Sequence, residues 1–141
     1  MESSHPVRVL VVTDRTGAPP ALVDAIRARA QRGPAQFRLL VPNPAPAEWH
    51  PMHPERHDKA AEAERVLARA LPALEEAAGA SVIGSVSVRH DPMDAIEETL
   101  LDEPFDEIIL STAPHGVKWL HVDLPHRVAH LGLPVTTVSH D

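Results

Sequence analysis

Four residues near the end of the chain could take part in ligand binding or catalysis. Ser111 and Thr112 directly follow an apolar run, and His115 and Gly116 come shortly after them. Together with Asp14, which follows another apolar run, Ser111 and His115 supply the three groups of a hydrolytic triad. The Gly-x-Ser-x-Gly turn of α/β hydrolases is absent. We therefore expect a ligand-binding loop without enzymatic activity, with a Ser111-dependent hydrolase as the alternative.

Histidines form a second candidate site, for a metal ion. His50, His53 and His57 have the spacing H-x2-H-x3-H, and imidazole nitrogens bind zinc or nickel. They lie in a segment rich in proline, residues 42–57, and proline opposes regular structure. We interpret them as solvated loop residues and expect no metal, while a histidine-based metal-binding protein stays as an alternative function.

A further histidine pair, His126 and His130, is spaced to share one face of a helix. Zinc hydrolases that bind the metal through two histidines of one helix have a glutamate between them, and the sequence has no glutamate between His126 and His130. These histidines are interpreted first as surface or interface residues.

Length and composition restrict the function classes. The chain has 141 residues, 43% of them hydrophobic, which indicates a single globular domain over residues 1–141. A formal charge of −7 disfavours nucleic acids and anionic membranes as partners. The chain lacks cysteine, which excludes disulfides and thiolate metal sites and is compatible with the reducing cytoplasm. We see neither a signal peptide nor an apolar run of membrane-spanning length, and expect a cytoplasmic protein.

Apolar runs alternate with amphipathic segments along the whole chain. The expected strands are Val7–Val12, Phe37–Val41, Ser81–Val88, Glu107–Thr112 and Val135–Val138. The expected helices are Pro20–Arg32, Asp58–Ala78, one from Pro92 to before Glu103, and Asp123–Gly132. Pro72 lies inside the second helix and is expected to kink or split it. This alternation predicts βαβ units around a parallel sheet.

Four stretches carry a resemblance to a known family. They are VRVLVVTDRTG, LLVPNP, VSVRHDPMDAI and EIILSTAPHG followed by DLPHRVAHLGLPVTTV. From Val7 to Val138 the chain resembles the universal stress proteins of the adenine-nucleotide α-hydrolase-like superfamily. The resemblance implies a three-layer, doubly wound α/β fold with a five-stranded parallel sheet in the order 3-2-1-4-5. A ligand crevice then lies between strands 1 and 4.

The resemblance also implies which residues line that crevice. Asp14 matches the acidic residue on the adenine side, and Val41 matches a second-strand position near the ring. A turn-forming role for Asp14 remains an equal alternative. The expected ligand-binding residues are Thr13, Asp14, Val41, Ser111, Thr112, His115 and Gly116.

The phosphate-binding motif of the family matches poorly. ATP-binding members carry a Gly-x2-Gly-x9-Gly-Ser/Thr pattern after the fourth strand, and here only Gly116 remains. Val122 and Asp123 stand near the third glycine and the hydroxyl. A carboxylate at a helix start caps the free N–H groups that would otherwise bind phosphate. ATP is therefore disfavoured, and the cofactor is unknown.

Together these features predict a non-enzymatic universal-stress-type protein that acts through protein contacts or a small ligand. The resemblance implies a homodimer through the last strand, Val135–Val138, whose unpaired edge invites pairing. The alternative functions are a stress regulator that binds ATP or AMP, and the metal-binding protein named above.

Overall fold

The computed structural model describes residues 6–13, 17–42, 55–87, 92–112 and 124–139. Its strands are β1 (Val7–Val12), β2 (Ala35–Val41), β3 (Ile83–Val86), β4 (Glu107–Thr112) and β5 (Val135–Ser139). Its helices are α1 (Pro20–Gln31), α2 (Glu55–Ala78), α3 (Pro92–Asp102) and α4 (Leu124–Ala129). Strands and helices alternate along the chain, as the sequence predicts.

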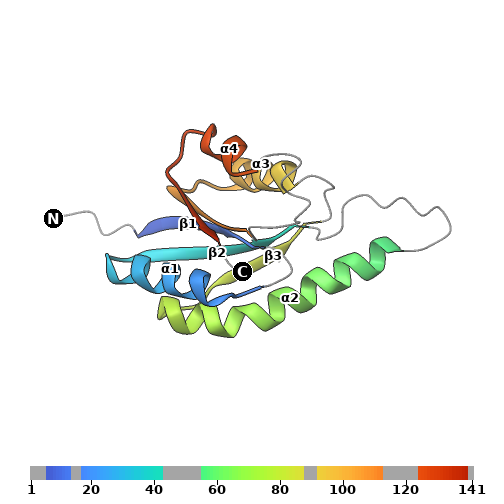
Figure 1. Cartoon of the computed structure of the whole chain (residues 1–141), viewed down its shortest axis with the longest axis horizontal. Helices are drawn as coiled ribbons and strands as arrows, with labels where there is room; N and C mark the ends of the chain where they lie inside the picture. The colour runs from blue at the N-terminus through green and yellow to red at the C-terminus, as the bar shows by residue number, and fades with distance from the viewer. Residues whose placement is uncertain (1–5, 14–16, 43–54, 88–91, 113–123, 140–141) are drawn as a thin grey trace.

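The five strands form one parallel sheet in the order β3-β2-β1-β4-β5, which confirms the predicted fold class. Helices α1 and α2 cover one face, and α3 and α4 cover the other (Figure 1). The chain thus runs outward from β1 to β3 on one face, crosses to β4, and continues to β5 on the opposite face. This is the doubly wound arrangement.

Burial on both faces explains why the central strands are mostly apolar. Side chains of a strand alternate between the two faces, so a strand between two helical layers has no polar side. In β1, Val9 and Val11 pack in the layer with α1 and α2, whereas Leu10 and Val12 pack in the layer with α3 and α4. All four are fully buried.

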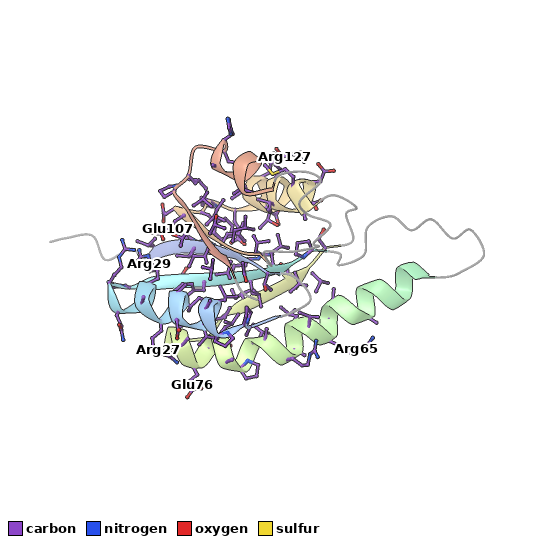
Figure 2. The ribbon with its side chains drawn as sticks, viewed as in Figure 1. Arg27, Arg29, Arg65, Glu76, Glu107 and Arg127 are labelled. Carbon is purple, nitrogen blue, oxygen red and sulfur yellow. The ribbon has the colours of Figure 1, made fainter. Side chains whose placement is uncertain are left out.

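Two features of the sequence explain helix α1: a proline at its first position, and buried residues at helical spacing. Pro20 is the first helical residue, where a missing N–H costs nothing. Leu22, Ile26 and Arg29 lie at helical spacing and are the buried residues of the helix. Arg29 is accommodated there because its Nε donates to Glu107 Oε2 of β4 at 3.1 Å. Figure 2 shows both side chains at the same end of the sheet.

Helix α2 corrects the predicted bounds of its segment and settles part of the prediction about Pro72. It begins at Glu55, so His57 is helical, and the predicted loop over residues 42–57 is shorter than expected. Pro72 lies inside one continuous helix, so of the two predicted outcomes, a kink or a split, the split is excluded. Proline removes one helical hydrogen bond at a cost of about 3 kcal/mol. Val66, Ala70 and Leu74 are buried against the sheet layer and hold both halves in place.

We expect Pro72→Ala to raise the free energy of unfolding by about 1–3 kcal/mol, because Pro72 is exposed and alanine restores the missing hydrogen bond. Urea denaturation monitored by circular dichroism measures the change. Glu76→Ala, also at an exposed position of α2, is the control and should stay within about 0.5 kcal/mol of the parent. A destabilised Pro72→Ala variant would show that the helix needs the proline.

The third strand is shorter than predicted at its start. It begins at Ile83, because the backbone N–H of Val82 donates to Glu75 Oε2 of α2 at 3.0 Å. The predicted end at Val88 lies outside the described residues. The second strand is longer than predicted, since Ala35 and Gln36 already pair with Val7 and Arg8.

Helix α4 ends at Ala129, three residues before the predicted end. The next backbone bonds are of the shorter i to i−3 type, from His130 N to Arg127 O at 3.2 Å and from Leu131 N to Val128 O at 3.0 Å. Gly132 then adopts a φ of 91°, which ends the turn. His130 therefore lies beyond the helix, and the prediction that His126 and His130 share one helix face is wrong.

None of the helices within the described ranges combines the length and the apolar character that a membrane crossing needs.

Candidate ligand site at the carboxyl ends of the central strands

The order of the sheet reverses between β1 and β4. The chain leaves β1 towards α1 on one face and leaves β4 towards α4 on the other (Figure 1). In doubly wound proteins, ligands bind beside the carboxyl ends of the strands at this reversal. The residues at these two strand ends are therefore the first candidates for a functional site.

One row of side chains crosses the sheet at this carboxyl edge. Val41 pairs with Val86, and Ser111 pairs with Val138. Continuing the registers of β1 with β2 and with β4 by one residue places Thr13 between Val41 and Ser111. These five residues lie on the face covered by α1 and α2, because they alternate in step with Val9, Leu39 and Ile109 of that layer. The row thus holds two hydroxyls between valines.

The hydroxyl of Thr13 is satisfied within the protein. Thr13 is fully buried, and its Oγ1 donates to the backbone oxygen of Gly17 at 2.7 Å. Its backbone N–H donates to Leu40 O at 3.2 Å, which extends the β1–β2 ladder by one bond. Gly17 has a φ of 76°, and a Cβ placed on it would lie 3.6 Å from Val66 Cγ1 and Ala70 Cβ of α2. The hydroxyl of Thr13 is therefore bonded to the residue from which the chain continues towards α1, and is not left over for a ligand as a donor.

The hydroxyl of Ser111 differs from that of Thr13 in one decisive respect. Ser111 is 0% exposed, and its Oγ has no hydrogen-bond partner among the described residues. An unpaired buried polar group costs about 1–3 kcal/mol, and most such groups in proteins are paired. At the reversal of a doubly wound sheet, an unpaired hydroxyl is a candidate hydrogen-bonding group for a bound molecule.

The comparisons with known proteins bear on the fold. Neither a family model nor a curated protein matches the sequence. Among solved structures, a universal stress protein from Archaeoglobus fulgidus aligns with a TM-score of 0.64 at 15% identity, covering 94% of this chain and 93% of the other. The chain has the universal stress protein fold. A universal stress protein from the same organism in complex with dAMP aligns with a TM-score of 0.61 at 15% identity, covering 96% and 99% of the two chains.

Within this universal stress protein fold, three of the predicted site residues come together. Thr13, Val41 and Ser111 lie on neighbouring strands, on one face and at one edge of the sheet. Val41 is fully buried and its carbonyl accepts from Ser87 N at 3.1 Å. Thr112 is the last residue of β4 and pairs with Ser139.

Three other predicted site residues, Asp14, His115 and Gly116, lie outside the described residues. So does Asp123, which was expected to cap the last helix and to disfavour phosphate binding. Their roles stay predictions. Of the metal candidates, His50 and His53 also lie outside, and within the described ranges no three histidine or acidic side chains are grouped so that they could hold a metal ion.

Sequence reasoning missed Gly17 as the partner of Thr13. A signal was present, because a glycine shortly after a strand often supplies the positive φ that a return turn needs. It also missed a group of charges towards the opposite end of the sheet, where Arg8 and Arg38 interrupt the mostly apolar strands β1 and β2. An arginine in a strand that is expected to be buried requires a partner, and the sequence did not indicate which one.

Proposed function

We propose that this chain is a non-enzymatic, universal-stress-type protein that binds a small molecule where β1 and β4 end, and that it works as a homodimer. The fold supports the protein type. The position of Thr13 and Ser111 at the reversal of the sheet supports the location of the ligand. The absence of a serine-hydrolase turn around Ser111 supports binding without catalysis.

The buried, unpartnered Oγ of Ser111 carries the proposal. The hydroxyl of Thr13 already donates its hydrogen bond to Gly17 O, so towards a ligand its oxygen can only accept. The hydroxyl of Ser111 can both donate and accept. The valines that flank the two hydroxyls offer apolar contact on either side. Such a row fits a largely apolar or flat ligand with one or two polar atoms directed at the centre of the sheet.

Native mass spectrometry of protein purified without added ligand tests this proposal. We expect an adduct of small-molecule mass on the parent, and about a tenfold weaker retention of it in Ser111→Ala, which corresponds to one lost hydrogen bond. Ser81→Ala, an exposed serine before β3, is the control and should retain the adduct. Equal retention in Ser111→Ala and the parent would exclude Ser111 as a ligand contact.

A nucleotide is the second candidate ligand. The similar structure bound to dAMP favours it, because that protein shares the fold over nearly the whole chain. Calorimetry with dAMP and with ATP and Mg²⁺ separates the possibilities. Binding of dAMP with a dissociation constant on the order of 1–10 µM would establish a nucleotide site. We expect ATP to bind more weakly, because in the sequence Asp123 falls near the glycine and hydroxyl positions of the family's phosphate-binding motif, and a carboxylate there would repel phosphate.

The homodimer rests on the edge position of β5. This strand pairs only with β4 among the described strands, and Thr136 and Thr137 are exposed. An exposed edge strand can pair with a copy of itself. Sedimentation equilibrium is expected to give twice the mass of one chain, and the mass of a single chain would contradict the dimer.

A further inference from the structure

The row of side chains that contains Thr13 and Ser111 ends at Val138 of β5, the last strand of the sheet. Val138 pairs with Ser111 and is partly buried against the layer with α1 and α2. Among the described strands, β5 pairs only with β4, so the row stops at an open edge. A molecule that covers this edge therefore lies next to the candidate ligand site.

The backbone of β5 shows which of its residues can pair across the open edge. Ile108 N of β4 donates to Pro134 O at 2.9 Å, and successive residues of a strand direct their backbone groups to opposite sides. The even-numbered residues of β5 therefore direct theirs towards β4, as Pro134 does. The odd-numbered residues, with Thr137 in the middle, direct theirs towards the open edge.

A second copy of β5 fits this edge. A closed two-fold pair of one strand with its copy must be antiparallel, because a parallel ladder does not treat its two strands equivalently. Centring the pair on Thr137 makes the most hydrogen bonds, because all the outward backbone groups of the five-residue strand Val135–Ser139 then find partners. This strand contains no charged residue, so the pairing brings no like charges together in a chain of net charge −7.

We propose that the second copy of the homodimer completes the ligand site with its Thr136. In the register centred on Thr137, Val138 lies opposite Thr136 of the partner subunit, and the Cα atoms of such a pair without mutual hydrogen bonds are about 4.5 Å apart. Paired residues share one face of a sheet, so the threonine hydroxyl extends the row of Ser111 and Val138. The inference rests on the proposed function, on both its ligand and its homodimer.

The extended row indicates the length and the chemistry of the ligand. Neighbouring strands are about 4.8 Å apart, so Ser111 and Thr136 of the partner subunit, with Val138 between them, are about 10 Å apart. A ligand that bonds to both hydroxyls therefore has polar atoms at its two ends and an apolar middle over Val138. Because this ligand contacts both copies, it binds the dimer more tightly than the single chain.

Single-cysteine variants test the register, since the chain itself lacks cysteine. A disulfide needs two Cα atoms about 4.4–6.8 Å apart. We expect Thr137→Cys to cross-link to its own copy under mild oxidation, because Cα atoms paired at that position are about 5.5 Å apart. Thr136→Cys alone should not cross-link, because it lies diagonally from its own copy at about 7–8 Å.

Two further samples complete the cross-linking test. A mixture of Thr136→Cys and Val138→Cys proteins should form mixed disulfide-linked dimers, because these two positions face each other in the register centred on Thr137. Ser81→Cys, at an exposed position before β3, is the control and should not cross-link.

Native mass spectrometry of protein purified without added ligand tests the contribution of the second copy, since it resolves single chains and dimers in one spectrum. We expect the small-molecule adduct on the dimer, and an adduct-bearing fraction about tenfold smaller on single chains. Thr136→Val removes the hydroxyl and keeps a β-branched side chain, and should lower retention by the dimer about tenfold. Ser81→Ala, which removes an exposed hydroxyl elsewhere, is the control and should retain the adduct.

The outcomes distinguish this inference from the proposed function. A single-chain mass in sedimentation equilibrium, or no adduct on any species, would overturn both. With a dimer and an adduct present, equal adduct fractions on single chains and dimers, or unchanged retention in Thr136→Val, would overturn only the contribution of the second copy. Self-cross-linking of Thr136→Cys as readily as Thr137→Cys would show a different register and overturn the inference by itself.

Discussion

Replacing Glu107 by alanine is expected to lower the free energy of unfolding by about 3–5 kcal/mol, the loss usual when one member of a buried ion pair is removed. The side chains of Arg29 and Glu107 are 9% and 20% exposed, and the pair joins α1 to the start of β4. Without the carboxylate, Arg29 keeps a permanent charge in a buried position among apolar neighbours. Urea denaturation with linear extrapolation measures the loss.

The matched control for Glu107→Ala removes both charges. In Arg29→Met with Glu107→Leu, no buried charge is left unpaired, and we expect the stability to return to within about 1 kcal/mol of the parent or to exceed it. A loss below about 1 kcal/mol in Glu107→Ala itself would mean that Arg29 reaches water easily, and that the pair is not buried in solution.

The second large effect is expected from Leu10→Ala, with a loss of about 2–5 kcal/mol in the free energy of unfolding. Leu10 is 0% exposed in the middle of β1, in the layer with α3 and α4. The substitution removes buried methyl groups and leaves a cavity next to the central strand, where the surrounding strands cannot easily move inward. Thermal and urea unfolding should both report the loss.

Leu101→Ala is the control for the size and chemistry of the Leu10→Ala substitution. Leu101 lies on α3 and is 89% exposed, so its removal should change stability by no more than about 0.5 kcal/mol. Equal losses in the two variants would contradict the assignment of Leu10 to the core and of Leu101 to the surface.

The apolar runs predicted the central part of the fold closely. The predicted bounds of β1 and β4 agree with the structure, because strands buried on both faces contain long apolar runs that are easy to recognise. The parallel order of the sheet followed from the alternation of strands and helices together with the family resemblance. The predicted strand bounds were less accurate where a side chain accepts a hydrogen bond from the backbone, as Glu75 does from the N–H of Val82.

The meeting of Thr13, Val41 and Ser111 could be predicted, since the carboxyl ends of parallel strands share one edge of a sheet. The difference between the two hydroxyls could not be predicted, because it depends on the hydrogen bond between Thr13 Oγ1 and Gly17 O, which no sequence pattern indicates. The partner of Arg8 and Arg38 could not be predicted either. Glu103 is far from both in the sequence and comes close to them only because the chain folds back after α3.

A crystal structure of protein purified and crystallised without added ligand would test most directly whether a small molecule binds where β1 and β4 end. We expect electron density too large for water, with a polar atom about 2.6–3.2 Å from Ser111 Oγ and in contact with the row that includes Val41 and Val138. A Ser111 Oγ that is hydrogen-bonded to another protein group, with no molecule beside it, would contradict the proposed function.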